Sequence, residues 1–146
     1  MIKANPYLNF DGNTREAMEF YKSVFGGEFN SVMTFGEMAQ PDQPVAEEEK
    51  DRIMHMSLPI GEELWIMASD ISPSHGHKLT MGNNNYICLV PETKEEGQRI
   101  FDELSVGGKV EMPFEKMFWG DYFASFFDKF GVGWMINWGE KKENEK

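Results

Sequence analysis

The sequence repeats its landmarks at intervals of about 80 residues, and this internal repeat constrains the fold more than any other feature. A strand start, a helical aromatic residue and a glycine stop recur in the same order in both halves. They are Tyr7 with Tyr86, Tyr21 with Phe101, and the glycine pairs at 26–27 and 107–108, which lie 79, 80 and 81 residues apart. The repeat predicts two copies of one supersecondary unit. Two unrelated βα units in an ordinary α+β domain are the alternative.

The first half, residues 5–70, predicts the order β-α-β-β-β. The first strand ends in an Asp-Gly turn, and a helix follows with Asn13 as its N-cap and Glu16 three residues later. Apolar residues recur at helical spacing until a glycine pair ends the helix. The strands are predicted at 7–10, 29–35, 53–58 and 64–68, with a polar loop at 37–51 and a hairpin connection at 59–63.

The second half, residues 85–138, predicts the same order after a linker at 71–84 that is rich in Gly, Ser, Pro and Asn. Thr93 and Glu96 form a Thr-x-x-Glu capping box, and the glycine pair at 107–108 closes the helix. We predict a disordered tail at 139–146 because these residues are mostly charged. The strands are predicted at 85–90, 109–114, 121–127 and 133–138. The fold class is α+β, with two βαβββ modules in one domain over residues 1–146.

The chain is strongly acidic, with a net charge of −11 over 146 residues. An acidic surface repels phosphate groups and anionic lipids, so nucleic acid and membrane surfaces are not expected as partners. No apolar run reaches the roughly 18 residues of a membrane span, and no signal-like segment opens the chain, so we expect a cytoplasmic protein. The charged run at 47–51 is expected in solvent.

Four segments of the chain share a pattern with a known family. The first half carries Asn-Pro-Tyr-Leu-Asn-Phe-Asp-Gly at 5–12 and Ala-Met-Glu-Phe-Tyr-Lys at 17–22. The second half carries Phe-Trp-Gly-Asp at 118–121 and Asp-Lys-Phe-Gly-Val-Gly-Trp-Met-Ile-Asn at 128–137. These segments resemble PhnB-like proteins of the glyoxalase/bleomycin-resistance/dioxygenase group, the vicinal-oxygen-chelate superfamily. The resemblance implies two βαβββ modules around a cleft, often in a homodimer.

The resemblance also implies where a metal would bind. Metal-dependent members of the superfamily take His, Gln and Glu ligands from strands 1, 4, 5 and 8. Those positions fall near Pro6, Met67, Tyr86 and Met135, and none of these side chains supplies an imidazole or a carboxylate. Divalent cations such as Mg²⁺ and Zn²⁺ need such donors. We therefore expect no metal and no other cofactor.

The remaining histidines and the cysteine have ordinary structural interpretations. His55 lies between two Met residues on a predicted strand, where one hydrogen-bond partner satisfies it. His75 and His77 lie in the linker, and two ligands do not complete a metal site. Cys88 is the only cysteine, which excludes an intramolecular disulfide, and we expect it to be buried in its strand.

Aromatic residues gather in the last third of the chain, where they form either a core or the wall of a ligand pocket. Pockets for small molecules combine apolar walls with a few polar groups. We predict that a ligand contacts aromatic, polar and Met side chains from both halves. The predicted ligand-binding residues are Asn9, His55, Met67, Tyr86, Trp119, Tyr122, Phe126, Met135 and Asn137.

Three functions remain open at this point. The first is a metal-independent protein that binds a small molecule, with an unknown ligand. The second is an enzyme of the isomerase or lyase type with His55 or Tyr86 as its acid or base. The third is a purely structural dimeric module. Some proteins of this kind are described as demethylubiquinone methyltransferases, but the chain lacks a glycine-rich nucleotide loop between a strand and a helix.

Overall fold

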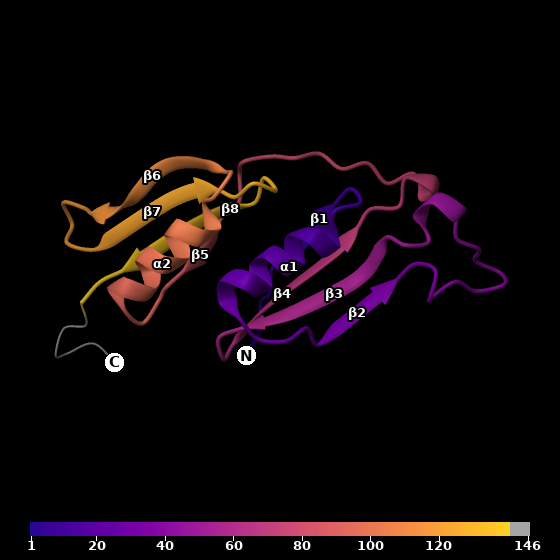
Figure 1. Ribbon diagram of the computed structural model, residues 1–146, viewed down its shortest axis with the longest axis horizontal. Helices are drawn as coiled ribbons and strands as arrows, with labels where there is room; N and C mark the ends of the chain where they lie inside the picture. The colour runs from indigo at the N-terminus through magenta and orange to yellow at the C-terminus, as the bar shows by residue number, and fades with distance from the viewer. Residues whose placement is uncertain (141–146) are drawn as a thin grey trace. The chain divides into compact units, whose positions relative to one another are not determined.

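The structure is a computed structural model that describes residues 1–140, so part of the predicted tail at 139–146 lies outside the described residues. The chain divides into two compact units, Met1–Thr80 and Met81–Lys146. Each unit has the element order β-α-β-β-β and holds one four-stranded sheet with one α-helix, as Figure 1 shows. The predicted α+β fold class is confirmed.

The first unit builds its sheet in the order β1-β4-β3-β2. β1 pairs with β4 in parallel, and the other neighbours are antiparallel. Short 3-10 turns at Glu47–Glu49 and Pro73–His75 lie in the connections. The elements are β1 (Tyr7–Phe10), α1 (Thr14–Phe25), β2 (Ser31–Thr34), β3 (Ile53–Ile60) and β4 (Leu64–Asp70).

The second unit repeats this topology with the strand order β5-β8-β7-β6. β5 pairs with β8 in parallel, and the remaining pairs are antiparallel. Identical pairing in both halves confirms that the two halves are copies of one motif. The elements are β5 (Ile87–Leu89), α2 (Lys94–Leu104), β6 (Lys109–Lys116), β7 (Tyr122–Phe127) and β8 (Gly133–Trp138).

Each helix covers one face of its own sheet. The apolar stripe of α1 buries Ala17, Met18 and Tyr21 completely, and alternate residues of β3 and β4 meet it from the sheet. In the second unit, Phe101 of α2 makes an edge-on contact with Phe126 of β7 at 5.3 Å between ring centroids. The opposite face of each sheet carries no helix of its own unit; we call it the open face.

The carboxylate of Asp70, at the end of β4, holds the start of α1. One oxygen accepts hydrogen bonds from the backbone N–H of Gly12 and from both the N–H and the hydroxyl of Thr14, at 2.7–3.1 Å. The other oxygen accepts the N–H of Ile53 at 2.8 Å. Asp70 is 4% exposed. Asn13 occupies the predicted N-cap position, but its side chain makes no capping hydrogen bond.

The second unit uses a buried aspartate differently. One oxygen of Asp128 accepts the N–H groups of Phe130 and Val132, and the other accepts the indole N–H of Trp134 at 2.8 Å. Its carboxylate therefore ties the β7–β8 turn to the fully buried Trp134. The α2 N-terminus is capped locally, since Thr93 Oγ1 accepts the N–H of Glu96 at 3.0 Å, as predicted.

Several boundaries differ from the predictions. β3 extends through Pro59, which pairs with Trp65, so the turn shortens to residues 61–63. α2 ends at Leu104, before the predicted glycine stop. Gly108 has another role, because a Cβ there would lie 2.0 Å from the carbonyl oxygen of Phe127. The neighbouring strand therefore leaves no room for a side chain at this position.

One acidic residue of the 47–51 run is not in solvent. Glu49 is 4% exposed, and its carboxylate accepts hydrogen bonds from the hydroxyl and the N–H of Ser74 and from the hydroxyl of Ser72. The Ser74 hydroxyl, followed by its N–H, lowers the pKa of Glu49. These contacts explain why a charged side chain is buried in this loop.

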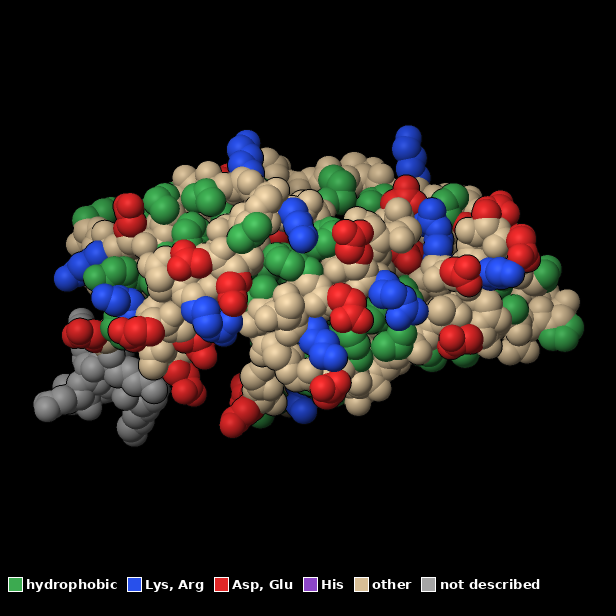
Figure 2. Space-filling view, viewed as in Figure 1, with side chains coloured by type: hydrophobic (Ala, Val, Ile, Leu, Met, Phe, Trp, Pro, Cys, Tyr) green, Lys and Arg blue, Asp and Glu red, His purple; other side chains and the backbone are tan. Residues whose placement is uncertain are grey.

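The charged residues are mixed in sign. On the face drawn in Figure 2, Lys and Arg side chains alternate with Asp and Glu side chains and form no basic patch among the coloured residues. Within residues 1–140, no helix combines the length and the apolar character that crossing a membrane requires.

Asp70→Asn should destabilise the protein by about 2–4 kcal/mol, because the amide replaces one acceptor oxygen with an NH₂ group that faces backbone donors. Urea denaturation followed by circular dichroism measures the loss. Asp51→Asn, at an exposed position, is the matched control and should change stability by less than about 0.5 kcal/mol. Equal stability of the two variants would show that Asp70 does not hold α1.

Candidate functional site

The open face of the second sheet carries a hydrogen-bonded polar cluster. Glu111 on β6 accepts a hydrogen bond from the hydroxyl of Tyr86 at 2.7 Å and another from the hydroxyl of Ser125 at 3.0 Å. The ring of Tyr86 lies 5.3 Å from that of Phe127. The hydrogen bond to Glu111 is the main cause that raises the pKa of Tyr86. Tyr86 is therefore held as a neutral phenol, which suits it to donate a hydrogen bond and not to act as a base.

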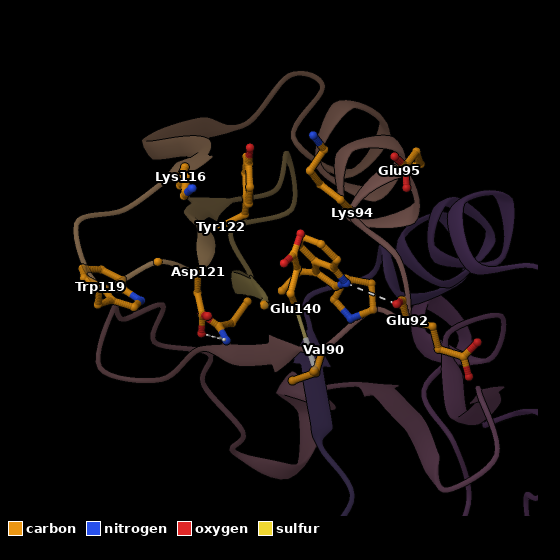
Figure 3. A pocket seen from close by; sticks show the side chains of 14 residues that line it. Val90, Glu92, Lys94, Glu95, Lys116, Trp119, Asp121, Tyr122 and Glu140 are labelled. Atoms are coloured by element: carbon orange, nitrogen blue, oxygen red, sulfur yellow. Dashed lines mark hydrogen bonds between the residues drawn. The ribbon is translucent and has the colours of Figure 1, made fainter. Parts of the chain in front are cut away.

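A cavity of about 1150 Å³ lies at one end of the second sheet, beside the start of α2. It collects residues that follow β5, begin α2, end β6 and β8, and begin β7 (Figure 3). Three aromatic side chains line it, together with charged and amide groups. The aromatic residues are Trp119, Tyr122 and Trp138.

Strand register explains which side chains meet in the cavity. Lys116, Tyr122 and Trp138 are direct cross-strand neighbours on β6, β7 and β8, and so share one face. The rings of Tyr122 and Trp138 lie 5.9 Å apart. The indole N–H of Trp138 donates to the carbonyl oxygen of Glu92 at 3.2 Å, which fixes its orientation. We call Lys116, Tyr122 and Trp138 the cross-strand row.

A second polar pair lies beside this row. The side-chain amide of Asn137 donates to a carboxylate oxygen of Asp121 at 3.1 Å, as the dashed line in Figure 3 shows. Trp119, in the β6–β7 turn, is half exposed, and its ring centroid lies 6.1 Å from that of Phe123. The cavity thus combines flat apolar walls with hydrogen-bonding groups, as pockets for small organic molecules do.

Eight of the nine predicted ligand-binding residues fall into three groups in the structure, and Phe126 belongs to none of them. Trp119, Tyr122 and Asn137 line the cavity. Tyr86 and Met135 belong to the open face of the second sheet. Asn9, His55 and Met67 belong to the open face of the first sheet, within the other unit.

Phe126 is the exception among the predicted residues. It is completely buried beneath α2, where it contacts Phe101. Side chains alternate along β7, so Phe126 lies on the helix-covered face and its neighbour Ser125 lies on the open face. Its placement on a ligand-binding surface is wrong, and it belongs to the core.

His55 and Tyr7 form a pair on the first open face. The Tyr7 hydroxyl lies 3.1 Å from His55 Nδ1, and the two rings are 5.7 Å apart. The histidine therefore has the single hydrogen-bond partner that its structural interpretation requires. Asn9, on the same face, accepts a hydrogen bond from the Ser69 hydroxyl at 3.3 Å.

The positions expected to ligate a metal do not fit one. Met67 pairs with Tyr7 in the first sheet, and Met135 pairs with Cys88 in the second. The side chains at the expected positions Pro6, Met67, Tyr86 and Met135 are a proline ring, two thioethers and a phenol, which are not the donor set of Mg²⁺ or Zn²⁺. Among residues 1–140, no three His, Cys, Asp or Glu side chains gather in a metal-binding cluster. His75 and His77 use their Nδ1 atoms toward Ser72.

The prediction for Cys88 is wrong in one respect, because the residue is exposed and not buried. It lies on the open face of the second sheet, since it pairs with Met135 and alternates with the buried Leu89. Partial desolvation raises the pKa of its thiol, which keeps it protonated at neutral pH.

Sequence reasoning missed Glu111, Lys94 and Lys116. Glu111 lies in a strand whose alternation is interrupted by register shifts, so its face was not predictable. Lys94 begins α2 and Lys116 ends β6, and no local pattern brings them together. Their meeting at one cavity depends on sheet topology.

Known proteins match this chain over nearly its whole length. A sequence profile of the Glyoxalase/Bleomycin resistance protein/Dioxygenase superfamily matches residues 3–136. Protein YjdN of Escherichia coli (strain K12) is 37% identical over 136 residues, which are 91% of this chain and 92% of that protein.

Solved structures match the fold as well. Protein PA1353 from Pseudomonas aeruginosa is 36% identical, with a TM-score of 0.84 and coverage of 97% of this chain and 100% of that one. A Bacillus cereus protein described as a putative 3-demethylubiquinone-9 3-methyltransferase, PhnB protein, is 24% identical, with a TM-score of 0.75 and coverage of 94% and 100%. At 24% sequence identity, the likeness to the Bacillus cereus protein supports the fold alone. The matches together confirm the resemblance found in the sequence.

Glu111→Gln should lower the pKa of Tyr86 toward the ordinary tyrosine value, because the neutral amide no longer favours the protonated phenol. Tyrosine labelled with ¹³C at Cζ reports the titration by NMR, and Tyr86→Phe identifies the resonance. Glu62→Gln, in the first unit, is the control and should leave the titration unchanged. An unaltered Tyr86 titration in Glu111→Gln would rule out the assigned cause.

Proposed function

The chain belongs to the glyoxalase/bleomycin resistance protein/dioxygenase superfamily, and from that premise we propose that it binds a small organic molecule without a metal ion. The binding site is the cavity at the end of the second sheet. One observation carries the proposal: three aromatic side chains, a hydrogen-bonded Asp121–Asn137 pair and two lysines border one cavity of about 1150 Å³.

The aromatic residues of the cavity support an organic ligand. Pockets for such ligands pair apolar walls with a small number of oriented polar groups. At about 1150 Å³, this cavity is somewhat larger than the roughly 300–1,000 Å³ of such pockets, and its lining is more polar. Tyr122 and Trp138 present adjacent rings at an interplanar angle of 53°, and Trp119 adds a third indole. Aromatic rings bind flat ligands by stacking and edge contacts.

The donor chemistry supports a metal-independent role. Met67 and Met135 occupy two of the positions from which the resemblance would draw ligands, and a thioether is a poor ligand for hard cations. The polar groups of the cavity are amides, carboxylates and ammonium groups, which bind organic molecules directly through hydrogen bonds and charge.

Binding is favoured over the isomerase or lyase hypothesis by the state of the two candidate groups. The hydrogen bond to Glu111 raises the pKa of Tyr86, so its phenol stays protonated at neutral pH and is not available as a base. His55 is engaged by Tyr7 on the first open face. Neither group lines the cavity.

We further propose that the protein forms a homodimer. β6 is an edge strand of the second sheet, and it exposes Val110 and Met112. Exposed apolar edge strands are templates for pairing with another chain. Pairing with β6 of a second copy would cover both the unpaired strand edge and the exposed apolar side chains.

Binding should be visible at individual tryptophans. On adding 2-naphthamide, an uncharged flat probe, the indole N–H resonances of Trp119 and Trp138 should shift in ¹H–¹⁵N spectra. The signals of the buried Trp134 and of Trp65 in the first unit should not move. Trp→Phe variants assign the four resonances.

Tyr122→Ala should weaken binding of 2-naphthamide about fivefold, since one aromatic contact is lost; Tyr7→Ala is the control. Shifts confined to Trp65, or none at all, would contradict the proposed site.

The homodimer should have twice the chain mass of 16.8 kDa by light scattering after size exclusion at micromolar concentration. The double variant Val110→Lys, Met112→Lys should be monomeric, because two ammonium groups oppose edge pairing. Val106→Lys, exposed in the turn before β6, should remain dimeric. A wild-type mass near 16.8 kDa would rule out the dimer.

A further inference from the structure

Building on the proposed function, we propose that the ligand of this cavity is a flat molecule that bears an anionic group. Lys94 and Lys116 bind the anionic group, and the rings of Tyr122 and Trp138 bind the flat body. The proposal runs against the net charge of −11, so it rests on where the charges lie and not on their sum.

Lys94 reaches over the cross-strand row from α2. Its Nζ lies 4.9 Å from the centroid of the Tyr122 ring, within the range of a cation–π contact. Figure 3 shows the side chain extending from the helix toward the Tyr122 hydroxyl. The ring therefore fixes an ammonium group at the cavity without neutralising its charge.

Lys116 approaches the same ring from the sheet. It is the direct cross-strand partner of Tyr122 and so lies on the same face. Among residues 1–140, neither Lys94 nor Lys116 forms an ion pair with a carboxylate. The sheet and α2 thus each contribute one lysine beside Tyr122 at the cavity.

The carboxylates around the cavity are arranged differently. Asp121 already accepts a hydrogen bond from Asn137. Figure 3 shows the side chain of Glu92 directed away from Tyr122. Glu95, Asp121 and Glu140 also line the cavity, and their negative charges would oppose an anionic ligand. This arrangement gives the lysines and Glu140 opposite expected effects on the same ligand.

Three probes that share one ring system separate charge from shape: 2-naphthoate, 2-naphthamide and 2-naphthylmethylammonium. In equilibrium dialysis at low salt, naphthoate should bind most tightly, naphthamide less tightly and the ammonium probe most weakly. Lys94→Met and Lys116→Met should each weaken naphthoate binding about two- to fivefold, the effect of one partly exposed charge pair. Binding of naphthamide should change little.

Further variants give the sign of each effect. Glu140→Gln should strengthen naphthoate binding, because a repelling charge is removed. Lys94→Arg should retain it, since the charge is kept. Lys109→Met, at the other end of β6, removes a lysine outside the cavity and should have no effect. Added KCl should weaken binding of naphthoate and not of naphthamide. Circular dichroism checks that each variant is folded.

The outcomes distinguish this proposal from the function on which it rests. Equal binding of naphthoate and naphthamide, unaffected by the lysine variants, would overturn the anionic class and leave small-molecule binding intact. Tighter binding of the ammonium probe would also overturn it, since the carboxylates would then decide the charge preference. If no probe binds and no cavity tryptophan responds, both proposals fail.

Discussion

A four-stranded sheet that carries one helix buries only one of its two faces, and this constraint shapes both halves of the protein. Because side chains alternate along a strand, every second residue lies beneath the helix and its neighbours lie on the open face. Ala124, Phe126, Trp134 and Ile136 form the covered face of the second sheet. Ser125, Met135 and Asn137 lie on the other face. The core and the polar groups are therefore fixed by the same alternation.

The cavity forms where this two-faced order ends. At the end of the second sheet, Tyr122 and Trp138 come from the helix-covered face, and Asn137 comes from the open face. Its hydrogen bond to Asp121 and the bond of Trp138 to Glu92 hold these groups in place. Preorganised side chains lower the entropy cost of binding, because fewer rotamers are lost when a ligand enters. Asn137 and Trp138 are thus already oriented at the cavity that we propose as the binding site.

Charge is organised locally in an acidic chain. Buried carboxylates are used within the fold: Asp70 holds the start of α1, and Asp128 holds the β7–β8 turn. These groups are stabilised by several donors each, which offsets the cost of burying them. Lys94 and Lys116 at the cavity make no ion pair with a carboxylate among the described residues. Net charge therefore describes solubility and long-range attraction, whereas specificity depends on which charges the fold leaves at the site.

The sequence by itself determined the repeat, the element order and the family, because periodic apolar positions, caps and glycine stops act locally. It also placed Trp119, Tyr122 and Asn137 among the ligand-binding candidates, and all three line the cavity. Only the tertiary structure decided that Phe126 is core, that Cys88 is exposed, and that Asp70 rather than Asn13 caps α1. Likewise, Tyr86 donates a hydrogen bond to Glu111, and Lys94 and Lys116 line the same cavity, although the members of each pair are more than 20 residues apart in the chain. Such contacts depend on strand register and helix docking, and a one-residue shift in register reverses the face of every side chain, so no local pattern contains them.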